Sequence, residues 1–256
     1  MSLHHRFDGA DRAPTLVLAN SLATTLELWD DNVAALASRY QILRYDQRGH
    51  GRSPVSPGPY RVEDLAEDAL ELLDELGLER VTFCGLSLGG AVGIALALRA
   101  PERLERLILC CSSAQFAPPE KWVERARTAR VEGLEPLVDA TLERWFTPAF
   151  RAGRPEAVAR LRDQFLATPR EGYAACCEAL AAWDAREQIA SIAVPTLAIA
   201  AADDPSTPPE HLEAIAAAIP GTELIVVPDA AHIVNIAQPE AFASAILSHA
   251  LLEEAG

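Results

Sequence analysis

One segment constrains the fold more than any other: the run GLSLGG at residues 85–90, with Ser87 at its centre. An apolar, β-branched run at residues 80–84 precedes it, and a helical stretch of small apolar residues follows at 89–99. A serine with glycines two residues before and after, between a strand and a helix, predicts a nucleophile elbow, in which glycine leaves room for neighbouring backbone. The alternative is a glycine-rich helix start capped by the serine.

Short β-branched or apolar runs alternate with longer helical patterns along the rest of the chain, which is typical of βα units in a mainly parallel sheet. We expect strands at residues 15–19, 41–45, 80–84, 107–111, 195–200 and 223–227, and an antiparallel edge strand at 3–7. Helices are expected at residues 62–76, 89–99, 209–219 and 239–252. The predicted fold class is α/β, with helices covering both faces of the sheet.

The alternation is interrupted at residues 116–189. This stretch contains helical patterns, such as those at 119–132 and 134–144, and no convincing strand pattern. The strand–helix pattern then resumes at Pro195. We therefore predict an α/β core formed by residues 1–115 and 190–256, with residues 116–189 inserted as a helical cap over one edge of the sheet.

A serine nucleophile needs a base, and the base needs an orienting acid. When a serine of this kind sits on a nucleophile elbow, the chain order is serine, acid, histidine, which leaves three histidines after Ser87. His232 follows the last expected strand, on a loop at the carboxyl edge where active sites gather. His211 and His249 fall within expected helices. We therefore predict that His232 is the base.

Two adjacent aspartates follow the preceding strand and could orient His232. We favour Asp204, because Pro205 fixes the turn directly after it and the extra residue carries the chain past the strand end. Asp203 remains the alternative.

Acyl transfer also needs N–H donors for the developing oxyanion. We expect one from the backbone of Leu88, the residue after the nucleophile, and a second from Leu22, in the loop that follows the strand at 15–19.

The charge balance excludes some partners. The chain has 22 Lys+Arg against 37 Asp+Glu, a net charge of −15, which disfavours nucleic acid and anionic membrane surfaces. No apolar run approaches the roughly 20 residues that span a bilayer. Residues 116–189 hold 11 of the 22 cations against 12 acids, so the expected cap is nearly neutral.

The five cysteines include two adjacent pairs, at 110–111 and 176–177, and no C-x-x-C or histidine-rich metal spacing. We expect reduced core thiols in a cytoplasmic protein, with neither a metal nor a cofactor. The first residues lack the continuous apolar stretch of a secretory signal.

With these motifs in place, the chain resembles the α/β-hydrolases from end to end and, among them, the 3-oxoadipate enol-lactone hydrolases. The segments that carry the resemblance are LANSLAT at 18–24, WD at 29–30, LRYDQRGHGRS at 43–53, FCGLSLGG at 83–90, LERWFTPAF at 142–150, ATP at 167–169, EGYAACC at 171–177 and DPSTPP at 204–209. The cap segments and Asn20-Ser21, where most relatives have His-Gly, are the more specific ones.

The chain departs from the lactonase pattern at two places. It has Ala23 where glycine is usual, and Ala181-Ala182 where the pattern has an Arg-Asp pair. We expect these departures to reshape the cap side of the pocket.

The resemblance implies a carboxylic ester hydrolase that opens 3-oxoadipate enol-lactone, a small anionic molecule, in aromatic-compound catabolism. The carboxylate of this lactone needs a cationic partner, and the planar guanidinium group of arginine can bind a carboxylate through two hydrogen bonds. We expect this cation to be Arg144, with Arg130 and Arg186 as alternatives. Three tryptophans of the expected cap either line an apolar pocket wall or pack the cap: Trp122, Trp145 and Trp183.

Other functions share the fold and the triad: a small-ester carboxylesterase, a carbon–carbon bond hydrolase or a cofactor-free perhydrolase. Haloalkane dehalogenases and epoxide hydrolases are disfavoured, because those relatives have Asp at the position of Ser87. A non-catalytic binding protein of this fold would be expected to lose Ser87, Asp204 or His232, and all three are present.

Overall fold

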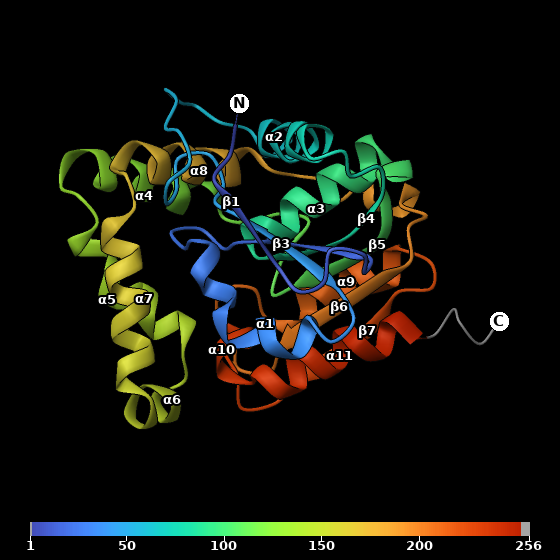
Figure 1. Cartoon of the computed structure of the whole chain (residues 1–256). Helices are drawn as coiled ribbons and strands as arrows, with labels where there is room; N and C mark the ends of the chain where they lie inside the picture. Colours follow the sequence, from blue (N-terminus) through green and yellow to red (C-terminus); the bar gives the residue numbers. More distant parts are fainter. Residues whose placement is uncertain (1, 252–256) are drawn as a thin grey trace.

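The computed structural model describes residues 2–251 and contains one seven-stranded sheet in the order β1-β3-β2-β4-β5-β6-β7 (Figure 1). β1 is antiparallel to β3, and every other pair is parallel. The strands are β1 His5–Asp8, β2 Thr15–Ala19, β3 Gln41–Tyr45, β4 Val81–Leu86, β5 Leu104–Cys110, β6 Thr196–Ala201 and β7 Glu223–Val227. The predicted sheet is confirmed, with β2, β3 and β7 at their predicted bounds.

Helices cover both faces of this sheet, which explains why β2, β4 and β6 are buried along their whole length. α2 (Val62–Glu75) and α3 (Leu88–Arg99) lie on one face, and α1 (Asp30–Leu36), α10 (Val234–Ala237) and α11 (Pro239–Leu251) on the other (Figure 1). α9 (Pro209–Ala218) packs against β6 and β7. Three 3₁₀ turns, at Leu26–Trp29, Pro101–Arg103 and Ile189–Ser191, complete this part of the chain.

The predicted helices of the core are confirmed to within a residue or two at their ends. Position 252, where we expected the last helix to end, lies outside the described residues. Across residues 2–251, no helix combines the length and the apolar character needed to cross a membrane.

Five helices lie between β5 and β6, as the interrupted pattern predicts. They are α4 Pro119–Val131, α5 Glu135–Trp145, α6 Pro148–Gly153, α7 Pro155–Ala167 and α8 Arg170–Ala182. Proline stands in the first turn of four of them, where its missing N–H costs nothing. An isolated bridge between Gln115 and Asp184 joins the two ends of the insertion. It supports our proposed division of the chain into a core of residues 1–115 and 190–256 and a cap of 116–189.

The cap contacts the core through backbone as well as side chains. A Cβ atom on Gly172, in α8, would lie 2.0 Å from the carbonyl oxygen of Gly49 in the loop after β3, so only glycine allows this approach. The N–H of Ile233 donates to the carbonyl of Trp145, the last residue of α5, at 3.2 Å. These contacts seat the cap over the loops that follow β3 and β7.

The contact between Gly172 and Gly49 predicts that Gly172→Ala destabilises the protein by about 1–3 kcal/mol, the usual cost of overpacking, because neither backbone can move aside cheaply. Chemical denaturation monitored by tryptophan fluorescence measures it. Gly153→Ala, at the end of α6, is the matched control, since nothing lies within 4 Å of its added methyl group. Equal unfolding free energies for the two variants would contradict the close contact.

Candidate active site

Ser87 occupies the sharp turn between β4 and α3, with φ 56° and ψ −111°. Such a backbone is strained for any residue with a side chain and persists only where the surroundings impose it. The two flanking glycines make this possible: a Cβ on Gly85 would lie 2.0 Å from the carbonyl oxygen of Gly89, and one on Gly89 would lie 2.2 Å from that of Ala19. The sequence therefore builds a turn that presents the serine side chain outside the helix.

His232 and Asp204 meet at the carboxyl edge of the sheet, from the loops after β7 and β6. Nδ1 of His232 lies 2.7 Å from Oδ2 of Asp204, and both side chains are buried. The alternative acid, Asp203, is exposed and borders a different cavity, one that Ser87 does not line. The geometry favours Asp204 over Asp203 as the acid that orients His232.

Four groups hold the Asp204 carboxylate. Oδ1 accepts hydrogen bonds from the N–H groups of Ser206 and Thr207, at 2.7 and 3.2 Å, and Oδ2 accepts the hydroxyl of Thr207 at 2.7 Å as well as His232. Burial raises the pKa of Asp204, but the charge of His232 and these hydrogen bonds together outweigh burial and hold that pKa below its usual value. An ionised Asp204 accepts a hydrogen bond from the Nδ1–H of His232, which keeps the proton on Nδ1 and leaves Nε2 as the acceptor nitrogen of the ring.

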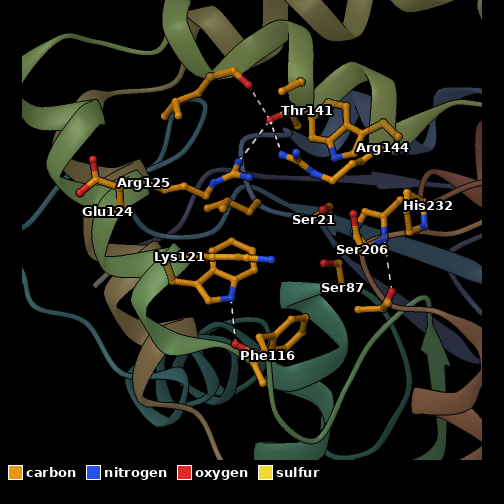
Figure 2. A pocket seen from close by; sticks show the side chains of 18 of the residues that line it. Ser21, Ser87, Phe116, Lys121, Glu124, Arg125, Thr141, Arg144, Ser206 and His232 are labelled. Carbon is orange, nitrogen blue, oxygen red and sulfur yellow. Dashed lines mark hydrogen bonds between the residues drawn. The ribbon is translucent and has the colours of Figure 1, made fainter.

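Ser87 and His232 line the same cavity (Figure 2). Within residues 2–251, no hydrogen bond joins the Ser87 hydroxyl to His232. Contacts between a nucleophile and its base are often long without substrate and shorten in the complex. The structure thus brings all three predicted triad residues to one site, with the acid–base contact formed.

The two predicted oxyanion donors are the backbone N–H groups of Leu88 and Leu22, and neither donates in the backbone hydrogen bonds of the loops and turns that the structure describes. Leu88 begins α3, so its N–H has no partner inside the helix and lies at the positive end of the helix dipole. Leu22 borders the same cavity, on a turn at residues 21–24 closed by a 3.3 Å hydrogen bond from the Thr24 N–H to the Ser21 carbonyl. Among the backbone hydrogen bonds of loops and turns in residues 2–251, the Leu22 N–H donates none.

The cavity has a volume of about 580 Å³, within the range of small-molecule sites. Core loops form its floor, and α4 and α5 form much of its wall. Its lining consists of Ser21, Leu22, Ser87, Phe116, Ala117, Glu120, Lys121, Trp122, Glu124, Arg125, Pro136, Leu137, Ala140, Thr141, Arg144, Trp145, Pro205, Ser206, Thr207 and His232.

Two guanidinium groups face this cavity from the cap (Figure 2). Arg144, on α5, and Arg125, on α4, each donate to the hydroxyl oxygen of Thr141 at 3.2 Å, and Arg125 also donates to the Tyr173 hydroxyl. Burial and the charge of Arg125 lower the pKa of Arg144. Neither arginine forms an ion pair with any residue that the structure describes. Two half-buried cations without a carboxylate partner favour an anionic ligand.

The alternative arginines lie elsewhere. Arg130 pairs with Glu171 and Glu178, between α4 and α8, and Arg186 pairs with Asp184 at the surface. Neither lines the cavity, so the expectation that one of them could bind the substrate carboxylate is wrong, because local acids already neutralise both.

Two of the three cap tryptophans reach the cavity. Trp122 donates its indole N–H to the carbonyl of Phe116 at 2.9 Å, and Trp145 packs edge-on against Phe165 with ring centroids 5.9 Å apart. Trp183 does not line the cavity and instead donates to the Ser113 carbonyl at the base of the cap, so its role is packing.

The two departures from the lactonase pattern lie outside the lining of the cavity. Ala181 and Ala182 end α8 and do not line the cavity. Ala23 is buried on the core side, in the turn at residues 21–24, where it has φ 62°. Neither departure touches the cavity, so the expectation that either one reshapes the cap side of the pocket stays a prediction.

Our expectations from sequence omit three residues of the site. Thr207 follows Asp204 by three positions, a spacing that favours a local Asx-type turn and could have indicated its hydroxyl. Arg125 and Lys121, the only lysine of the chain, carry no such signal, because α4 contains several charged residues and the sequence does not say which face the cavity.

All five cysteines are free and buried, and burial raises the pKa of Cys110 and Cys111 well above the usual value. They are thiols packed in the interior. Among residues 2–251, no cluster of His, Cys, Asp and Glu side chains could hold a metal ion.

Comparison with known proteins places this fold and site in a class. Residues 14–239 match the family model described as alpha/beta hydrolase fold, and the chain belongs to this family. It is 40% identical to 3-oxoadipate enol-lactonase 2 of Acinetobacter baylyi over 240 residues, which cover 94% of this chain and 89% of that protein. The resemblance inferred from the motifs is thereby confirmed.

Solved structures agree with this placement. The enol-lactonase from Burkholderia xenovorans is 44% identical, with a TM-score of 0.95 over 97% of this chain and 96% of that one. A thermophilic esterase from Thermogutta terrifontis is 30% identical, with a TM-score of 0.91 over 96% of this chain and 92% of that one. The chain is an α/β hydrolase closely related to enol-lactonases.

The hydrogen bond between Asp204 and His232 predicts that Asp204→Asn lowers kcat by about 10⁴-fold, because an amide favours the wrong tautomer of the base. Asp203→Asn, one residue away and exposed, should leave kcat unchanged. Steady-state hydrolysis of an aryl ester by the two variants measures both effects. A large loss in Asp203→Asn, or a small one in Asp204→Asn, would reverse the assignment.

Proposed function

We propose that this protein is a serine hydrolase that opens 3-oxoadipate enol-lactone to 3-oxoadipate, in the cytoplasm and as part of aromatic-compound catabolism. One observation carries the proposal: the serine elbow and the His232–Asp204 pair lie beneath a small cavity whose cap wall presents two unpaired guanidinium groups. The named activity of the relatives, at 40% and 44% identity, supports the choice of substrate.

In the proposed reaction, Oγ of Ser87 attacks the lactone carbonyl while Nε2 of His232 takes the serine proton. The backbone N–H groups of Leu22 and Leu88 stabilise the oxyanion that forms on the former carbonyl oxygen. Collapse of this intermediate breaks the ring C–O bond, and the enolate leaves with the proton that His232 holds. The enol becomes a ketone while the other end of the opened chain stays attached to Ser87.

Water then releases the product. His232 removes a proton from the water as its oxygen attacks the acyl-enzyme carbonyl, and the same proton returns to Oγ of Ser87 as the ester bond breaks. The first leaving group is an enolate, a weaker base than an alkoxide, so ring opening demands less acid assistance than cleavage of an ordinary ester. The product is a 3-oxo diacid with one carboxylate from the ring and one from the side arm.

The carboxylate on the side arm of the lactone is the part of the substrate that requires a cation. Arg144 is the group we assign to it, joined by Arg125 because Thr141 bridges both guanidinium groups. The net charge of −15 opposes long-range attraction of an anion, so recognition depends on these short-range contacts. Trp145 and Trp122 supply apolar wall for the ring.

A small-ester carboxylesterase is the second candidate, favoured by the 30% identity to the Thermogutta terrifontis esterase. The two functions use one triad and differ in what the cap wall must bind. An esterase for neutral esters has no use for two cavity-facing guanidinium groups, whereas the enol-lactone has a carboxylate to pair with them.

Ser87→Ala should abolish turnover of 3-oxoadipate enol-lactone while the fold is retained, because nothing else in the cavity replaces the nucleophile. Ultraviolet loss of the enol-lactone measures turnover, and circular dichroism of the variant checks the fold. Wild-type protein that hydrolyses aryl esters but leaves the enol-lactone intact would favour the esterase. Substantial lactone hydrolysis by Ser87→Ala would rule out the mechanism.

Arg144→Ala should reduce kcat/KM for the enol-lactone by about 10- to 100-fold, the worth of a charged hydrogen bond, and should leave a neutral aryl ester nearly unaffected. Arg125→Met, which keeps most of the side-chain volume, should show the same selectivity. Arg186→Ala removes a cap arginine already paired at the surface and is the control. An equal loss for charged and neutral substrates would exclude carboxylate recognition by these two residues.

A further inference from the structure

The turn that carries the Leu22 N–H is strained at one position. Ala23 has φ 62°, a left-handed backbone that favours glycine, and its side chain is fully buried. It is the third residue of the turn at 21–24, whose first and fourth residues are joined by the Thr24–Ser21 hydrogen bond. A turn with this backbone at its third position usually has glycine there, so an interaction outside the turn must hold it in place.

The imidazole of His50 supplies that interaction. Its Nε2 lies 2.9 Å from the backbone nitrogen of Ala23 and accepts the Ala23 N–H, while its Nδ1 lies 3.3 Å from the carbonyl oxygen of Arg48. A carbonyl can only accept, so Nδ1 carries the proton and Nε2 is left as an acceptor. The ring is buried, and burial lowers its pKa against the opposing effects of the Arg48 carbonyl and Asp46, which keeps it neutral.

The loop that holds His50 is itself fixed to the same region. Oδ1 of Asp46 accepts the N–H of Leu26, just beyond the turn, and Oδ2 of Asp46 accepts the N–H of Arg52. The 46–52 loop therefore contacts the 21–26 segment at two places, Asp46 at Leu26 and His50 at Ala23, next to Leu22.

We propose that His50 is a positioning residue for the oxyanion hole: by accepting the Ala23 N–H it holds the strained turn that aims the Leu22 N–H into the cavity. His50 does not line the cavity and touches no substrate. The inference rests on the proposed function only in its use of Leu22 as an oxyanion donor, which any ester or lactone substrate of Ser87 would require.

His50→Ala should lower kcat by about 10-fold or more with little change in KM, since a displaced oxyanion donor weakens the transition state rather than substrate binding. His50→Gln, whose carbonyl can reach the position of Nε2, should recover most of the rate, and the shorter His50→Asn should not. Turnover is measured with p-nitrophenyl acetate and with the enol-lactone. Active sites are counted by complete labelling with a serine-directed phosphonate.

The decisive variant is His50→Ala combined with Ala23→Gly. Glycine adopts the left-handed backbone without strain, so the turn should persist without the imidazole. On a logarithmic scale, the double variant should recover at least about half of the decrease in kcat that His50→Ala causes. A merely structural histidine would give no such recovery. His249→Gln, which changes a buried imidazole bonded to Glu223 far from the cavity, is the control and should keep its kcat.

Three results would overturn the proposal. These are an unchanged kcat per labelled site in His50→Ala, a loss equal in His50→Gln and His50→Asn, or a double variant no faster than His50→Ala. If His50→Ala does not fold, the Gln and Asn variants decide in the same way. Hydrolysis of p-nitrophenyl acetate without hydrolysis of the enol-lactone would reject the proposed substrate while leaving the test of His50 intact.

Discussion

The site depends on one close contact, at the turn after β4, where the backbones of β4, α3 and β2 approach too closely to leave space for a side chain. α3 begins so close to the end of β4 that Gly85 and Gly89 nearly touch, and Gly89 in turn lies against Ala19 at the end of β2. The serine is forced out of the helix, and the first N–H of α3 is left without an intrahelical partner. The proposed nucleophile and one proposed oxyanion donor thus lie at the same close contact, and the loop after β2 carries the second proposed donor.

The whole molecule has a net negative charge, but the cap wall of the cavity presents unpaired positive charges. A chain with 37 acidic and 22 basic residues leaves two arginines of its cap unpaired at the cavity wall, while other cap arginines, such as Arg130 and Arg186, pair with nearby acids. A negative charge lies beside His232, where the Asp204 carboxylate is buried, ionised and hydrogen-bonded through both oxygens. The cap side of the cavity therefore holds two guanidinium groups without an ion pair among the described residues, beside the acids Glu120 and Glu124, and on the core side the Asp204 carboxylate is bonded to His232.

Much of the fold could be predicted because the residues that begin and end its helices and strands are recognisable locally in the sequence. Pro119 and Pro209 mark helix starts, and strands such as β2 and β7 are bounded by turn residues on both sides. The edge strand β1 begins two residues and ends one residue later than predicted, since an edge strand with one solvent-facing side has a weak apolar pattern. The short helices α1 and α10 were not predicted, because four to seven residues carry too little periodicity to be recognised.

The residues of the predicted triad could be found because each lies in the turn or loop after a strand, and parallel strands bring their carboxyl ends together. The residues of the cap wall could not be predicted in this way. Which face of α4 or α5 meets the cavity depends on how the insertion packs, so Arg125 went unnoticed beside Glu124 and Arg127, which pair with each other at the surface. Ala23 stands out in the sequence as an alanine where glycine is usual, but only the structure shows that it is buried with a left-handed backbone.

The end of α5 serves two purposes at once. Arg144 and Trp145 line the cavity, while the Trp145 carbonyl accepts the N–H of Ile233, next to His232, the proposed base. A carbonyl is common to every amino acid, so side chains at 144 and 145 are free to diverge and create new substrate ranges without loosening the histidine loop. Insertions or deletions at this place are not tolerated in the same way, because they move the carbonyl that holds the histidine loop. Substitutions here can therefore change the range of substrates, whereas a change of chain length would disturb the site itself.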